Sequence, residues 1–255
     1  MKAWLRFFRV VNLPTVPGDV LVGASAVIYW TVNARRTVPY DVSAGLRLVA
    51  FAALASVFMY MFGLADNDIV GVEKDEGRPI PNGEISLGEA RLARGLSLFA
   101  VMIVGALGNL PSAWWMVSLA LALVVVVYNR TKWNFAMGLC RGLNVLCGVA
   151  ALTVSTAMRN DIPVGTLEDV FVSAIMWVPL FLVWMVYIAE VTWYSTGEEL
   201  NPAKKRRVGF LIGAIVYLQL IALLIFRVNS LLLAGAALLV VLRLMKRLLP
   251  EVSAS

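Results

Sequence analysis

The chain has 255 residues, of which 60% are apolar and 15% are charged, whereas a soluble domain is about 45–50% apolar and 25% charged, so a water-soluble fold is excluded. The formal net charge of +6 comes from Lys and Arg that flank apolar runs, which is typical of a topology signal, and no nucleic-acid partner is expected. The absence of histidine argues against zinc, haem and Ser-His-Asp chemistry, so any metal should be a hard cation held by carboxylates.

Eight apolar runs predict an all-α, polytopic transmembrane bundle of eight to nine spans. They cover roughly residues 16–33, 46–65, 95–109, 112–128, 134–157, 169–190, 208–226 and 229–247. At about 20 residues per span, these runs leave no room for a separate soluble domain, so residues 1–255 are expected to form one transmembrane domain. The connections at 108–111 and 227–229 are so short that they predict two tight helical hairpins.

Basic residues lie mostly on one side of the predicted bundle. If the amino terminus is placed inside, the other side holds only Arg35, Arg36, Arg47, Arg159 and Arg227. The positive-inside rule then predicts a multi-pass protein of the cell inner membrane with both termini in the cytoplasm. The polar loops at 66–94, 128–133 and 190–207 are expected on the same cytoplasmic side.

The first polar loop begins with Asn67 and Asp68 and continues through Gly71 to Asp75 and Arg78. If the helix continues to Asp75, residues 67, 71 and 75 share one face, and oxygen ligands line one stripe. Such a stripe suits phosphate oxygens that approach through Mg²⁺. The alternative is a solvated loop at the membrane edge.

Polar groups also occur at the end of the fourth predicted span and inside the fifth. Tyr128 and Lys132 are one helical turn apart, and a cation paired with a phenol can hold a leaving diphosphate; the alternative is an ordinary positive-inside loop. Arg141 and Asn144 share one face within a span, where lipid exposure would be costly, so they are expected to face the bundle interior. The Gly138-xxx-Gly142 spacing predicts close helix packing.

The third polar loop contains Glu190, Tyr194 and Glu198 at intervals of four residues, which would stack on a helix and repeat the acidic stripe of the first loop. The basic run at 204–207 that follows is most simply a topology determinant, with contact to anionic lipid as a second use.

These motifs resemble those of the UbiA superfamily of intramembrane prenyltransferases, and the resemblance covers most of the chain. The family motif Asn-Asp-x-x-Asp-x-x-x-Asp, followed by Arg-Pro-x-x-x-Gly, is matched by Asn67, Asp68, Asp75, Arg78, Pro79 and Gly83. Its Tyr-x-x-x-Lys element is matched by Tyr128 and Lys132, and the helix after it by Asn144 and Gly148. Arg9 and Asn12 are similar to the Arg-x-x-Asn start of many members.

The resemblance implies Mg²⁺-dependent transfer of a prenyl group from an isoprenoid diphosphate to an aromatic or other small or lipid acceptor within the membrane. It assigns catalysis to Asp68, Asp75, Lys132 and Tyr128, diphosphate binding to Asn67, Arg78, Arg141, Asn144, Arg9 and Asn12, and Mg²⁺ binding to Asn67, Asp68, Asp75 and Glu190. The implied partners are the prenyl diphosphate, the acceptor and membrane lipid.

Two departures from the family pattern leave alternatives open. Gly71 stands where the family has its middle aspartate, and the second acidic motif is reduced to Glu190 with Glu198 and Glu199; Asp66 and Glu73 are candidates to compensate. A UbiA-like protein that binds an isoprenoid or lipid without transferring it would show such losses. A transporter would also have about eight spans, but its polar site would lie at the membrane midplane and not in loops on one face.

Overall fold

The computed structural model describes residues 2–34, 42–73, 77–158, 167–195 and 201–249. Its helices are α1 (Lys2–Phe7), the 3₁₀ turn η1 (Val10–Asn12), α2 (Thr15–Ala34), α3 (Val42–Val70), α4 (Leu87–Leu107), α5 (Ser112–Thr131), α6 (Asn134–Met158), α7 (Leu167–Ser195), α8 (Pro202–Phe226) and α9 (Asn229–Leu248). No strand occurs in the described ranges.

The eight long helices α2 to α9 correspond one to one to the predicted apolar runs, so the predicted all-α bundle is confirmed. Seven segments of the described chain are long and apolar enough to cross a membrane, and α9 is not among them. Both predicted hairpins are present, because residues 108–111 alone separate α4 from α5, and Arg227 with Val228 alone separates α8 from α9. The chain is an integral membrane protein.

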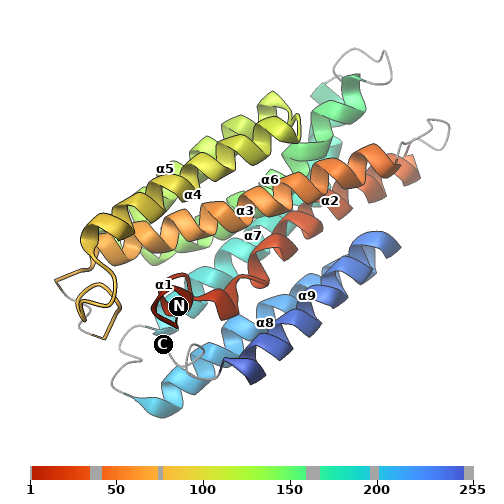
Figure 1. Cartoon of the computed structure of the whole chain (residues 1–255). Helices are drawn as coiled ribbons and strands as arrows, with labels where there is room; N and C mark the ends of the chain where they lie inside the picture. Colours follow the sequence, from red (N-terminus) through yellow and green to blue (C-terminus); the bar gives the residue numbers. More distant parts are fainter. Residues whose placement is uncertain (1, 35–41, 74–76, 159–166, 196–200, 250–255) are drawn as a thin grey trace.

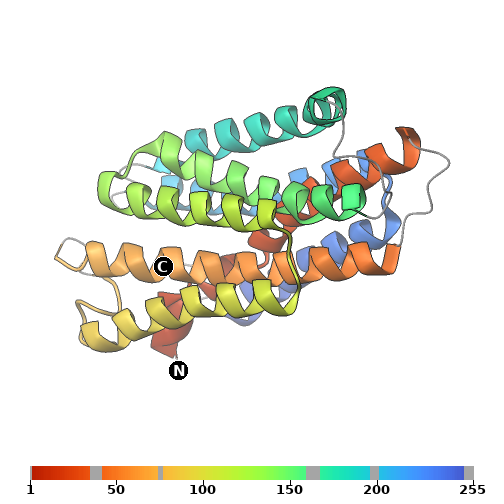
Figure 2. The same ribbon diagram turned by 90° about the horizontal axis from the view of Figure 1, so that it is seen from above.

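The long helices run side by side in alternating directions (Figures 1 and 2). As a result α3, α5, α7 and α9 end where α4, α6 and α8 begin, and α1 lies at this same end. The three polar loops predicted from the sequence therefore start from one end of the bundle. That this end faces the cytoplasm stays a prediction.

Helices α2 and α6 form the centre of the bundle and touch backbone to backbone. A Cβ atom added to Gly23 would lie 2.0 Å from the carbonyl oxygen of Val145, and one added to Gly148 would lie 2.1 Å from that of Val20. Only glycine permits this approach, because no side-chain atom can occupy that space.

Helix α6 makes a second close approach, to α7. A Cβ atom on Gly138 would lie 2.2 Å from the carbonyl oxygen of Met185, and one on Gly142 would lie 2.7 Å from the ring of Phe181. The close packing predicted from the Gly138-xxx-Gly142 spacing is confirmed. In contrast, α4 and α5 expose large apolar side chains such as Leu92, Leu107 and Met116, as lipid-facing helices do.

The acidic stripe at 67, 71 and 75 requires that the second predicted span continue as a helix to Asp75, and in the described residues this condition is not met. Helix α3 ends at Val70, and residues 71–73 form a turn. The amide of Gly71 still donates to the carbonyl of Asn67 at 3.0 Å, but glycine is a poor helix former and commonly ends helices. Asp75 itself lies outside the described residues.

We expect Gly148→Val to lower the free energy of unfolding by about 1–3 kcal/mol, because the new side chain forces α6 away from α2. Detergent-driven unfolding of the protein in lipid bicelles measures the loss. Gly95→Val is the matched control, since no atom lies within 4 Å of a Cβ at that position in α4. Equal stability of the two variants would contradict a backbone contact between α2 and α6.

Candidate functional site

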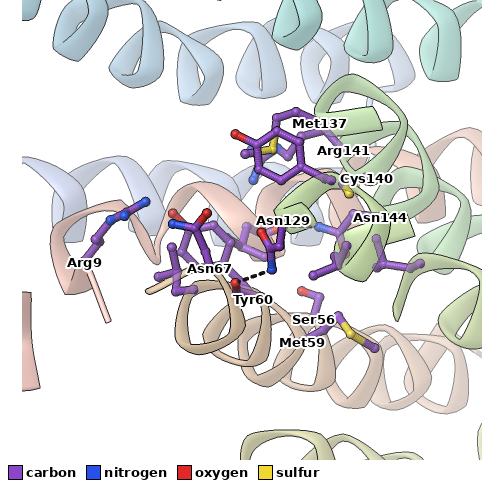
Figure 3. A pocket seen from close by; sticks show the side chains of 16 residues that line it. Arg9, Ser56, Met59, Tyr60, Asn67, Asn129, Met137, Cys140, Arg141 and Asn144 are labelled. Carbon is purple, nitrogen blue, oxygen red and sulfur yellow. Dashed lines mark hydrogen bonds between the residues drawn. The ribbon is translucent and has the colours of Figure 1, made fainter. Parts of the chain in front are cut away.

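A cavity lies between α2, α3, α5 and α6, with Arg9 at its edge (Figure 3). Apolar side chains such as Leu64, Leu121 and Val125 form much of its wall. The polar lining residues divide between two ends. Figure 3 shows Arg9 and Asn67 toward one end, which we call the outer end, and Ser56 and Asn144 toward the other, the inner end.

Two cations meet the carboxylate of Asp68 beside the outer end, where Arg9 and Asn67 line the cavity. Asp68 Oδ1 accepts from Arg9 Nη2 at 3.3 Å, from Arg78 Nη1, and from Asn67 Nδ2 at 3.3 Å. Lys132 Nζ donates to Asn67 Oδ1. We call these five residues the charged cluster; its guanidinium and ammonium groups are of the kind that bind phosphate oxygens.

Two residues of the charged cluster have a backbone conformation that residues other than glycine rarely adopt. Arg9 has φ 41° and Lys132 has φ 54°, both in the left-handed region. Each such residue costs on the order of 1–3 kcal/mol, and strain of this kind gathers at functional sites. Lys132 caps the end of α5, where its amide donates to the Tyr128 carbonyl and its Nζ lies 5.6 Å from the Tyr128 ring centroid. The predicted pairing of Tyr128 with Lys132 is thus present.

Asp66 lies close to Asp68 in the sequence but contacts different helices. Its carboxylate accepts from Arg94 Nη1 at 3.0 Å and from Asn129 Nδ2 at 2.9 Å, and Arg130 Nη1 lies 3.7 Å away. These partners belong to α4 and α5, so Asp66 fastens α3 to both helices. It is therefore not a spare carboxylate for the charged cluster.

A second polar network lies at the inner end and is centred on Asp19 of α2, which is fully buried. Asn144 Nδ2 donates to Asp19 Oδ2 at 3.1 Å and to the Val16 carbonyl at 2.9 Å. Arg141 Nε lies 3.0 Å from Asp19 Oδ2 as an ion pair outside hydrogen-bond geometry, and its Nη2 donates to the Thr15 carbonyl at 3.0 Å. The structure places Arg141 and Asn144 inside the bundle, as their spacing indicates.

Helices α7 and α8 also donate to Asp19. Trp184 Nε1 donates to Asp19 Oδ1 at 2.8 Å, and Gln219 Nε2 donates to the same oxygen at 2.7 Å. Sequence reasoning missed both donors and Asp19 itself. The available signal was a lone carboxylate inside the first apolar run, where an ionisable residue marks a site or a buried pair.

Several predicted site residues lie outside this arrangement. Glu190 has an exposed side chain on α7 and does not line the cavity, and Asn12 does not line it either. Asp75, Glu198 and Glu199 fall outside the described residues. Their predicted roles stay predictions.

The outer end offers few oxygen ligands for Mg²⁺ among its described residues. Within the described ranges, no group of three Asp, Glu, His or Cys side chains is placed to hold a metal ion. Mg²⁺ in proteins, however, is commonly held by one or two carboxylates together with substrate phosphates. Asp68 and the adjacent amide oxygen of Asn67 can supply the protein ligands of such a site, where substrate phosphates supply the others.

No family model and no curated protein matches this sequence. The fold does match two solved structures of a UbiA homolog from Archaeoglobus fulgidus. The structure bound to GPP and Mg²⁺ is 13% identical, with 98% of this chain and 88% of that chain covered and a TM-score of 0.54. The structure bound to DMAPP and Mg²⁺ is 13% identical over 98% and 87%, with a TM-score of 0.53. The predicted UbiA-like fold is confirmed.

We expect Asp66→Ala to lower the free energy of unfolding by about 1–3 kcal/mol, because it removes a buried acceptor from Arg94 and Asn129. The control is Glu84→Ala, which breaks a partly exposed ion pair with Arg6 and should cost under about 1 kcal/mol. Unfolding in bicelles measures both. An Asp66→Ala variant as stable as Glu84→Ala would show that Asp66 does not fasten the helices.

Proposed function

We propose that this chain, which has the UbiA fold, is an intramembrane prenyltransferase that takes a prenyl group from an isoprenoid diphosphate. The observation that carries the proposal is the charged cluster at the end of an apolar cavity inside a membrane protein. A prenyl diphosphate has the matching form, with an anionic head and an apolar tail. The prenyl diphosphates bound to the Archaeoglobus fulgidus homolog, GPP and DMAPP, support this assignment.

The diphosphate would bind at the charged cluster. Arg9 and Arg78 both reach the carboxylate of Asp68, and Lys132 reaches Asn67 from the end of α5. A guanidinium group can donate two parallel hydrogen bonds to two phosphate oxygens, whereas the ammonium group of Lys132 acts as a point charge. The side-chain contacts of Arg9 to Asp68 and of Lys132 to Asn67 would hold both cations in place before substrate arrives, which reduces the ordering that binding requires.

The prenyl tail would follow the apolar wall of the cavity formed by residues such as Leu64, Leu121 and Val125. This wall excludes water from the reacting carbon, so an allylic cation is captured by the acceptor and not by hydroxide. The ring of Tyr128 lies in the same wall, where its π-face can stabilise a passing positive charge.

Asp68 and Asn67, with Asp75 from the predicted motif, would hold Mg²⁺ against the diphosphate. The ion, when bound, neutralises charge that develops on the leaving group. The allylic C–O bond breaks with its electron pair going to the diphosphate, which Arg9, Arg78 and Lys132 stabilise. A bond then forms between the prenyl carbon and the acceptor, which releases a proton.

The test uses the full chain in lipid nanodiscs with geranyl or dimethylallyl diphosphate, a panel of phenolic and lipid acceptors, and Mg²⁺ or a chelator. We expect Mg²⁺-dependent release of diphosphate and a rate at least about 100-fold lower for Asp68→Asn, since transition-state charge is less well stabilised. Glu84→Gln is the matched control, as this carboxylate pairs with Arg6 away from the cavity. No Mg²⁺-dependent release by wild type would exclude transfer.

Binding without transfer is the second candidate, favoured by the single carboxylate in the described part of the charged cluster. It is separated by calorimetry with inorganic diphosphate. We expect Lys132→Ala to weaken this binding by about tenfold, because one cation of the cluster is lost. Wild-type binding without any turnover would select the second candidate, and equal binding by Lys132→Ala would place the anion elsewhere.

A further inference from the structure

The inner end of the cavity has a different electrostatic character from the outer end. Arg141 lines it, but its guanidinium is committed to Asp19 and to the Thr15 carbonyl. The charges of Asp19 and Arg141 cancel within one ion pair. Arg141 therefore presents no uncompensated positive charge to a ligand, although its position inside a span suggests an anion site.

Two residues that line the inner end have a buried polar atom without a hydrogen bond: Arg141 Nε, which is held in the ion pair with Asp19, and Asn144 Oδ1. Asn144 is 4% exposed and lines the cavity, and both bonds printed for its side chain come from Nδ2, to Val16 and Asp19. Within the described part of the chain, its Oδ1 accepts no hydrogen bond. A buried acceptor without a donor costs about 1–3 kcal/mol, and a ligand that supplies the donor removes this cost.

We propose that the inner end is the acceptor subsite and that it takes a neutral molecule whose hydroxyl group donates to Asn144 Oδ1. The inference rests on the proposed function and adds the chemical class of the second substrate. Ser56 does not compete for this role, since its hydroxyl donates to the Ala53 carbonyl at 2.8 Å. We assign the polar contact to Asn144 because its Oδ1 is the acceptor there without a donor, and the rest of the molecule would lie against the apolar wall.

A carboxylate is disfavoured at the same place for an electrostatic reason. Burial strips water from an anion, and the loss is recovered only if a free cation or several donors meet it. Arg141, the cation among the described residues that line this end, is already paired with Asp19, so it does not compensate the charge of a bound carboxylate. The subsite should therefore bind a ring that carries a hydroxyl group more tightly than the same ring with a carboxylate in its place.

The matched probes are 2-naphthol, which is neutral at pH 7, and 2-naphthoate, which is anionic. Equilibrium dialysis against the full chain in nanodiscs, with empty nanodiscs subtracted, gives both affinities without any prenyl donor. We expect wild type to bind 2-naphthol at least about tenfold more tightly than 2-naphthoate, because burial of the naphthoate charge without a partner is costly. Preference for 2-naphthoate would overturn the proposal.

Two variants test the two parts of the argument. Asn144→Leu should weaken 2-naphthol binding by about tenfold, and Asp19→Asn should move the ratio toward 2-naphthoate by about tenfold because Arg141 is left unpaired. Ser25→Ala is the control. Ser25 lies on α2, as Asp19 does, but it does not line the cavity. Its buried hydroxyl donates to the Val22 carbonyl at 2.7 Å. Size-exclusion profiles and helical circular dichroism confirm folding.

The outcomes separate this inference from the proposed function. If Asn144→Leu and Ser25→Ala both bind 2-naphthol as wild type does, the acceptor subsite is wrong even if diphosphate release is observed. If diphosphate is never released but the naphthol preference and its loss in Asn144→Leu hold, the subsite stands and the transfer reaction falls. Should Asp19→Asn not fold, the wild-type ratio and the Asn144→Leu result still decide.

Discussion

The buried carboxylate of Asp19 is the interaction on which the arrangement of the central helices depends. It draws donors from α6, α7 and α8 to α2, so four helices meet at one charge. The approach needs small residues as well, since a Cβ on Gly18 would lie 2.1 Å from Gln219 Oε1. Removal of one partner from such a buried pair typically costs about 3–5 kcal/mol. In a bilayer, where helices gain little from apolar burial against each other, this network supplies a directional contact that fixes their register.

The same network shapes the chemistry of the cavity. Because Asp19 pairs with Arg141 at the inner end, the described cations that meet near the cavity away from this pair are Arg9, Arg78 and Lys132 of the charged cluster. Under the proposed function, the anionic head of a prenyl diphosphate would bind at the charged cluster, and the inner end would be left for a second molecule. The two ends would then orient the substrate before its tail makes any contact.

The sequence predicts the helices well because each span is a local apolar run, and all eight long helices coincide with one. It also predicts much of the charged cluster, since Asn67, Asp68, Arg78 and Lys132 belong to spaced motifs and do converge. It does not predict the partners of Asp19, which lie between 122 and 200 residues away and are set by packing. Helical spacing does not carry across Gly71, because α3 ends at Val70 and glycine has a low helix propensity.

The separate fates of Asp66 and Asp68 follow from helix geometry. Each residue of an α-helix is rotated by about 100° from the one before it, so two residues that are two positions apart face nearly opposite directions. Asp66 accordingly meets Arg94 and Asn129 on one side, while Asp68 meets Arg9 on the other. Asp66 therefore cannot serve as the carboxylate that Gly71 lacks, because it faces away from the cluster. The described cluster is therefore rich in cations and poor in carboxylates, and its cations must carry a larger share of the charge of a bound diphosphate.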